Sequence, residues 1–111
     1  MAERTERNVS LGGLTKVELE LLRTVFRHHP ELTHVKLHGS RARGTERNNS
    51  DIDLALFGDL SGLECRRIRS ELDELPLPYR FDVTAYSRHT DPLIKSRIDE
   101  EGVTLYARAG E

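Results

Sequence analysis

The segment 33–57 holds two alternating strands with a glycine–serine turn between them, and this pattern constrains the fold more than any other part of the chain. Alternation of apolar and polar residues predicts half-buried strands at 33–38 and at 51–57. Their apolar positions are Val35, Leu37, Ile52, Leu54 and Leu56. Together with the helices expected elsewhere in the chain, the strands indicate an α/β (α+β) fold.

The turn that follows the first strand has the features of a phosphate cradle. Gly39 lacks a Cβ, so it allows a tight turn and a close approach of the backbone to a ligand. Ser40 suits the N-cap of a short helix, whose first amides would point at an anion. Arg41 and Arg43 add positive charge, either beside a phosphate or as solvated helix charges, and Gly44 ends the helix. A lone glycine–serine pair is usually only a turn, so the interpretation depends on its neighbours.

Three aspartates supply the neighbours that a phosphate cradle needs. Asp51 and Asp53 leave the same face of one strand, where a hard divalent cation can bridge them. Residues 80–86 form another alternating run, which projects Asp82 from the same surface if the two strands lie side by side. Three clustered carboxylates repel one another unless a cation is bound, so the cluster predicts Mg²⁺. The core face expected for the third run is Phe81, Val83 and Ala85.

A phosphate-binding turn beside metal-binding carboxylates is typical of nucleotide chemistry. In this combination the chain resembles the minimal nucleotidyltransferases of the DNA polymerase β superfamily, small standalone proteins often paired with a HEPN-domain protein. The resemblance extends from about Leu14 to Tyr106, and His38 departs from it, because relatives frequently carry an aromatic residue there. It rests on G-S-R-A-R-G at 39–44, S-D-I-D-L at 50–54 and E-G-V-T-L-Y at 101–106.

The resemblance implies a polymerase β-like palm, a small mixed sheet with helices packed on one side. It implies that Gly39 and Ser40 bind the triphosphate, with Arg41 and Arg43 expected nearby. The implied reaction is an in-line transfer of AMP from ATP to a hydroxyl, with pyrophosphate leaving. The residues expected to be catalytic and to hold Mg²⁺, as two ions, are Asp51, Asp53 and Asp82.

The acceptor of the transferred group is expected to be a partner protein. Larger transferases of the superfamily carry extra domains that hold the acceptor, and 111 residues leave no room for one. The resemblance points to a hetero-oligomer with a HEPN ribonuclease toxin, which the chain would neutralise as an antitoxin by AMP transfer, by binding, or by both. Two alternatives stay open: a non-catalytic nucleotide-binding subunit, or a small-molecule nucleotidyltransferase with a separate substrate-binding subunit.

Composition excludes several other classes of function. The net charge of −2 lacks the basic footprint of a protein that grips nucleic acid, so no direct nucleic-acid binding is expected. No apolar run is long enough for a membrane span, and the first residues lack a secretory signal pattern. The single Cys65 excludes an internal disulfide and is compatible with a reducing cytoplasm, the expected location.

The rest of the chain is expected to form one domain at 14–108, preceded by a loose segment at 1–13. A capping box at Thr15 predicts a helix that Pro30 ends, Ser61 opens a second helix, and Pro92 opens a third that stops at Gly102. A short strand is expected at 103–106. The apolar helix faces are expected to be Val17, Leu21 and Val25; Cys65, Ile68, Leu72 and Leu75; and Leu93, Ile94 and Ile98.

The five histidines lack the spacing of a zinc site, because no cysteine or third ligand accompanies them at suitable distances. A surface or capping role is expected for all of them: His28, His29, His34, His38 and His89.

Overall fold

The computed structural model describes residues 9–44 and 51–108. The elements in chain order are β1 (Val9–Leu11), β2 (Leu14–Thr15), α2 (Lys16–Arg27), β3 (Leu32–His38), α3 (Ser40–Arg43), β4 (Ile52–Gly58), α4 (Gly62–Asp73), β5 (Phe81–Ala85), α5 (Pro92–Glu101) and β6 (Val103–Ala107).

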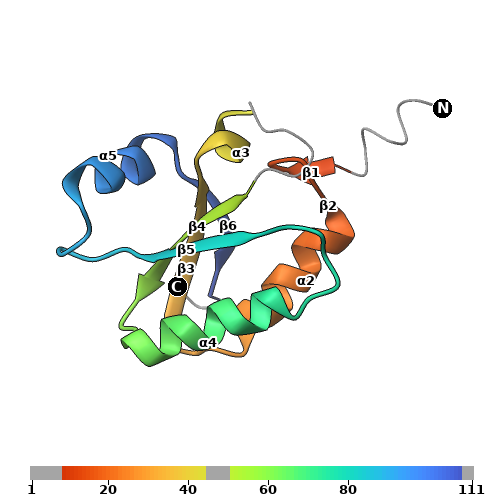
Figure 1. Cartoon of the computed structure of the whole chain (residues 1–111), viewed down its shortest axis with the longest axis horizontal. Coiled ribbons are helices and arrows are strands. Elements are labelled where there is room, and N and C mark those ends of the chain that lie inside the picture. Colours follow the sequence, from red (N-terminus) through yellow and green to blue (C-terminus); the bar gives the residue numbers. More distant parts are fainter. Residues whose placement is uncertain (1–8, 45–50, 109–111) are drawn as a thin grey trace.

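Four of the strands form one mixed sheet in the order β5-β4-β3-β6. Strand β3 is antiparallel to both β4 and β6, whereas β4 is parallel to β5. Figure 1 shows α2 and α4 together on one side of this sheet and α5 on the opposite side. The predicted small mixed sheet is confirmed, and α5 adds a helix on the second face.

The main core lies between the sheet and the pair α2 and α4. Helix α2 buries Leu19, Leu22, Val25 and Phe26, whereas Val17 is 71% exposed. The predicted face of this helix was therefore wrong at Val17. Positions 17, 21 and 25 are each four residues apart, and this spacing drifts away from a repeat of 3.6 residues per turn.

The predicted helix starts are confirmed by their caps. At α2, the amide of Glu18 donates to Thr15 Oγ1 at 3.1 Å, and the amide of Thr15 donates to Glu18 Oε1 at 3.0 Å. Ser61 caps α4 by accepting from the Glu64 amide at 3.1 Å. Asp91 caps α5, which begins with proline, as the sequence predicted. These bonds satisfy amides that the first turn of a helix leaves without partners.

A hairpin precedes α2 where the sequence predicted a loose segment. Strand β1 pairs with β2 in an antiparallel arrangement, so residues 9–13 are ordered, and residues 1–8 lie outside the described residues. Gly12 and Gly13 have φ angles of 59° and 79°, which glycine adopts readily, and they make the turn. Leu14 is fully buried and fixes the hairpin to the core.

The last helix is less buried than its sequence suggested. On α5 only Ile98 is fully buried, whereas Leu93 is 62% exposed. Ala85, at the end of β5, is also exposed rather than part of the core face. Leu93 belongs to a helix on the face away from α2 and α4, and Ala85 is the last residue of its strand. No helix in the described ranges is long and apolar enough to span a bilayer.

His29 is a buried bridge between two helices, whereas a surface or capping role was predicted for it. It follows α2, and its ring nitrogens lie 2.9 Å from Glu64 Oε2 and 2.8 Å from Glu71 Oε1, both on α4. Burial acts to lower the His29 pKa, but the hydrogen bonds and charges of the two carboxylates outweigh it and raise the pKa.

Candidate active site

Gly39 places the end of β3 directly against a carboxylate of β4. Its φ of 77° and ψ of −155° belong to a region that is essentially open to glycine alone. A Cβ at this position would lie 2.2 Å from Asp53 Oδ2, closer than any side chain tolerates. Glycine is therefore required here both by the backbone conformation and by the approach of Asp53.

The short helix α3 differs from its prediction at its first residue. Gly39, not Ser40, is the N-cap, and the amides of Ala42 and Arg43 both donate to the Gly39 carbonyl at 3.1 Å. These two amides are therefore held inside the turn and do not point at an anion. Gly44 ends the helix with a φ of 77°, as predicted.

Asp53 and Asp82 are brought together by the parallel pairing of β4 and β5, in which they are direct partners. Strands β4 and β5 therefore lie side by side, which is the condition on which the predicted place of Asp82 depended. The pKa of Asp53 is raised to about 6, first by burial and then by the charge of Asp82, the charge of Asp51 and a hydrogen bond with Asp82. Charge on both carboxylates is therefore unfavourable in the absence of a cation.

Asp51 takes a different position from the other two acids. Like Asp82 it is exposed, but it precedes the first residue of β4, and its charge contributes to the raised Asp53 pKa. Within residues 9–44 and 51–108, no three His, Cys, Asp or Glu side chains are arranged to hold a metal ion. The oxygen donors of Asp53 and Asp82 nevertheless suit a hard divalent cation, whose charge would offset the repulsion between them.

A cavity of about 370 Å³ lies over this pair, between the sheet and α5. The phosphate turn forms one wall, and Arg43 and Arg97 bring positive charge to it. Arg43 also pairs with Glu101 at 3.0 Å, an interaction that orients its guanidinium. The residues that line the cavity are His38, Gly39, Ser40, Arg43, Asp53, Asp82, Thr84, Ile94 and Arg97.

His38 belongs to the site, although a surface or capping role was predicted for it. Its Nε2 is buried without a hydrogen-bond partner in the part of the chain that the structure describes. Burial lowers the pKa of the ring, so His38 is held toward its neutral form. The pairing of His38 with Asp53 across β3 and β4 could have indicated this place, because paired residues share a face.

Thr84 and Arg97 also line the cavity and were missed. Thr84 stands two residues after Asp82 on one strand, so strand alternation could have found it. Arg97 comes from α5, and only the packing of that helix across the sheet places it here. No sequence motif links it to the turn.

Arg41 is not among the residues that line this cavity, contrary to its predicted place near phosphate. It is 3% exposed, its Nη1 donates to the Gly12 carbonyl at 2.8 Å, and its guanidinium lies 4.8 Å from the centre of the Tyr79 ring. Tyr79 in turn donates to the Glu18 carboxylate. Arg41 therefore connects α3 with the β1–β2 hairpin and with the chain before β5, which leaves Arg43 as the arginine of α3 at the cavity.

Comparison with known proteins shows the family to which this sequence is similar. Residues 20–111 match the family described as polymerase beta nucleotidyltransferase. No curated protein matches the chain at a significant level.

The structure is also similar to several solved structures. A toxin–antitoxin complex with AMP-PNP is 22% identical over 82% of this chain and 74% of that one, with a TM-score of 0.67. The toxin–antitoxin MntA–HepT is 18% identical, over 85% and 74%, with a TM-score of 0.64. A complex of an MNT antitoxin with a tri-AMPylated HEPN toxin of Shewanella oneidensis is 21% identical, over 81% and 66%, with a TM-score of 0.55. At these identities the similarity establishes the fold.

Proposed function

The chain belongs to the polymerase beta nucleotidyltransferase family, and from that premise we propose that it is a Mg²⁺-dependent enzyme that transfers AMP from ATP to a hydroxyl of a partner protein. The observation that carries the proposal is the pair of Asp53 and Asp82 beside a turn in which only glycine fits at position 39. Further support comes from the similar structures, one of which holds AMP-PNP and another a tri-AMPylated toxin.

The triphosphate occupies the cavity between the phosphate turn and α5. The Gly39 turn forms one wall of that cavity, and Arg43 and Arg97 balance the charge of the phosphate oxygens. Asp51, Asp53 and Asp82 would hold the divalent cations, which supply charge neutralisation of the leaving pyrophosphate and activation of the attacking hydroxyl. The carboxylate of Asp82 accepts the proton of that hydroxyl. Ile94 adds an apolar side chain to the lining of the cavity.

The partner in this proposal is a HEPN toxin, which the chain modifies in the cytoplasm as its antitoxin. The similar structures are toxin–antitoxin complexes, and a HEPN toxin is the AMPylated component in one of them. The mixed charge of this chain, with 17 basic and 19 acidic residues, favours a protein acceptor over a nucleic acid, which would need a basic surface.

The proposal is tested by incubating the purified complex with a HEPN partner in labelled ATP and Mg²⁺. Label is expected on a hydroxyl side chain of the partner, and Asp53→Ala is expected to abolish the labelling while the complex still forms. Efficient labelling of added RNA with none on the partner would contradict the proposal. Full protection of cells by the Asp53→Ala variant would instead favour a non-catalytic subunit that acts by binding alone.

A further inference from the structure

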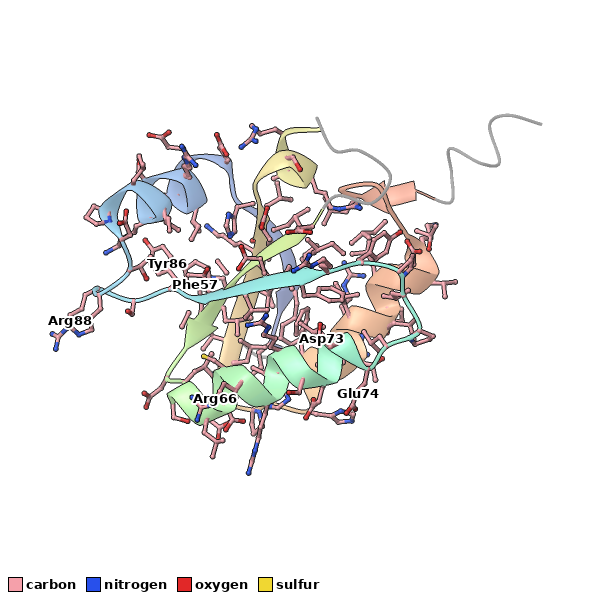
Figure 2. The ribbon with its side chains drawn as sticks, viewed as in Figure 1. Phe57, Arg66, Asp73, Glu74, Tyr86 and Arg88 are labelled. Atoms are coloured by element: carbon pink, nitrogen blue, oxygen red, sulfur yellow. The ribbon has the colours of Figure 1, made fainter. Side chains whose placement is uncertain are left out.

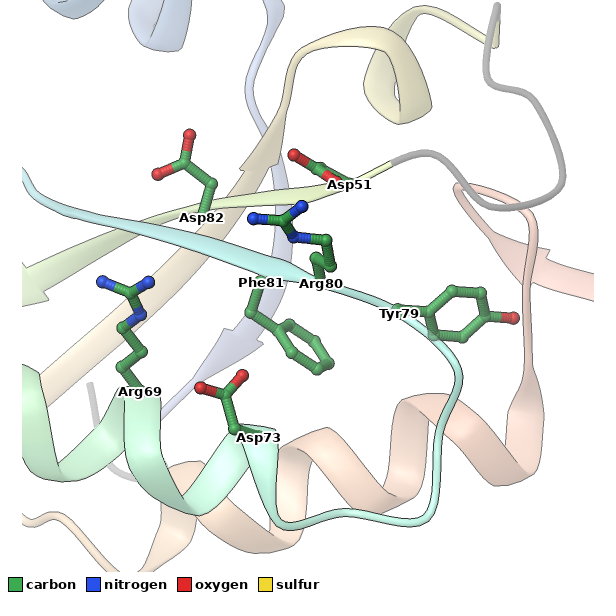
Figure 3. A pocket seen from close by; sticks show the side chains of 7 residues that line it. All are labelled: Asp51, Arg69, Asp73, Tyr79, Arg80, Phe81 and Asp82. Carbon is green, nitrogen blue, oxygen red and sulfur yellow. The ribbon is translucent and has the colours of Figure 1, made fainter.

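A second cavity, of about 520 Å³, lies along the outer edge of β5. Figure 3 shows Arg69 and Asp73 rising toward it from α4, while Arg80 and Asp51 stand on the other side of the strand. The cavity is therefore built by the sheet edge, by α4 and by the residues that lead into β5. Its lining residues are Asp51, Arg69, Asp73, Tyr79, Arg80, Phe81 and Asp82.

Asp82 lines both this cavity and the one that holds the phosphate turn. A displacement at phosphorus requires the attacking group and the leaving group to stand on opposite sides of the reacting atom. If pyrophosphate leaves on the side of Gly39 and Arg43, the attacking hydroxyl must arrive from the side that faces away from them. Among the described residues, those around the cavity beyond Asp82 provide a space for this approach.

The edge position of β5 indicates which kind of molecule fits there. In the described part of the chain β5 pairs with β4 alone, so its outer edge is open. The carbonyl of Arg80 and the amide of Tyr86 bond to β4, and the backbone alternation therefore turns the amides and carbonyls of Phe81 and Val83 outward. An extended peptide can pair with such groups, whereas a nucleic-acid strand offers no matching backbone pattern.

The charges of the cavity favour the same occupant. Within the described ranges, Arg69, Asp73 and Arg80 form no ion pair, so these charges are available to a bound molecule. The lining mixes two arginines with three aspartates. A mixed lining suits a peptide that carries both basic and acidic groups, while a polyanionic strand would be repelled by the aspartates.

We propose that this cavity is the acceptor site, in which an extended segment of the partner protein lies along β5 and points a hydroxyl side chain at Asp82. Arg69 holds an acidic group or a carbonyl of that segment and so positions it. This inference rests on the proposed function and adds the place and the chemistry of its acceptor. In the reaction, the hydroxyl oxygen bonds to the α-phosphorus of ATP and the bond between the α- and β-phosphates breaks. Pyrophosphate leaves, and the hydroxyl proton passes to Asp82.

The test compares Arg69→Ala with Arg66→Ala in the full chain, with its HEPN partner added at varied concentrations. Arg66 lies on the same helix, is exposed, and is not among the lining residues of this cavity (Figure 2). Loss of one charge-assisted hydrogen bond should raise the KM for the partner about tenfold or more in Arg69→Ala. The KM for ATP should not change, Arg69→Lys should recover most of the loss, and Arg66→Ala should behave like the wild type.

The outcomes separate this inference from the function on which it rests. If the wild type labels the partner and Arg69→Ala has an unchanged KM for it, the acceptor site is wrong and the transferase function stands. A fall in kcat and thermal stability without a change in KM would assign Arg69 a structural role and also overturn the inference. Labelling of RNA that falls in Arg69→Ala would mean that the cavity takes nucleic acid. If the wild type transfers AMP to no acceptor, the function itself fails.

Discussion

The two faces of the four-stranded sheet have opposite properties although they are built from the same strands. On the face toward α2 and α4, Val35, Ile52 and Leu54 are fully buried. On the other face, Asp53 and Asp82 crowd together at one end. Because side chains alternate along a strand, each acid lies next in sequence to core residues. The face toward α2 and α4 therefore stabilises the fold. The other face can carry charged groups, although their burial and mutual repulsion lower the stability.

Further along the same strands, the second face carries aromatic rings instead of acids. His34 and Phe57 stack with their ring centres 4.1 Å apart, and Phe57 stacks on Tyr86 at 4.4 Å (Figure 2). Lys95 of α5 lies over the Tyr86 ring, and the Tyr86 hydroxyl donates to Asp99 at 2.6 Å. These contacts attach α5 to the sheet and so support the wall of the cavity that Arg97 lines.

The largest expected effect of a single change falls on the second face. Asp53→Asn removes a carboxylate from the reaction site, so AMP transfer should fall by about 100-fold to 1,000-fold or more. Without Mg²⁺, the same change should raise the melting temperature at pH 7.5, because a carboxylate with a raised pKa destabilises the fold when it is charged. Labelling and thermal melting measure the two effects. A large loss of stability would contradict the separation of the two faces.

The neighbouring residue should give the opposite result. Leu54→Ala leaves a hole in the fully buried core, and its expected cost is about 2–5 kcal/mol in the free energy of unfolding. Urea denaturation measures this cost. Activity per folded molecule should remain close to that of the wild type, because the Leu54 side chain points away from the site. A cost near zero would mean that the helix-covered face is not what stabilises the fold.

Substitutions of the two glycines at the ends of α3 form a matched pair of variants, and their expected effects on stability are smaller. Gly39→Ala combines an unfavourable φ with a clash against Asp53, so it should cost about 1–3 kcal/mol and abolish ATP binding. Gly44→Ala has the same φ of 77° but meets no atom of the described residues within 4 Å, so it should cost about 1–2 kcal/mol and retain binding. Calorimetry and urea denaturation separate the two variants. Loss of binding in both would show that backbone strain alone, not the contact with Asp53, explains the requirement for glycine.

The smallest effect concerns His29, which belongs to the helix-covered side. Its pKa is raised in the folded state, so its stabilising contribution is complete below the ordinary value of 6.5 and disappears as the pH rises through the raised value. The difference in melting temperature between the wild type and His29→Gln should therefore be largest near pH 6 and should narrow at higher pH. A difference that grows with pH would contradict a charged His29 between Glu64 and Glu71.

Strand alternation was enough to predict β3, β4 and β5 and the places of Gly39, Asp53 and Asp82, because these depend on neighbours along one strand. The side chain of Arg41 was misplaced, since the β1–β2 hairpin captures it through the Gly12 carbonyl. Arg97 was missed because only the packing of α5 brings it to the cavity. Contacts between segments far apart in the sequence leave no local sequence pattern, so strand and helix periodicity cannot predict them.

The same limit explains His29. Its place at the end of a helix suggested a surface role, but two glutamates of α4, 35 and 42 residues further along, enclose its ring. A surface position and a buried ion pair look alike in a single sequence, because the partner comes from elsewhere in the fold.

The central claim is that the second face of the sheet binds a nucleotide and a divalent cation together. Isothermal titration calorimetry of ATP, with and without Mg²⁺, tests it most directly. The account predicts tight binding only when Mg²⁺ is present, loss of that dependence in Asp53→Asn, and thermal stabilisation when both ligands are added. Equal affinity for ATP with and without Mg²⁺ would contradict a shared metal and phosphate site.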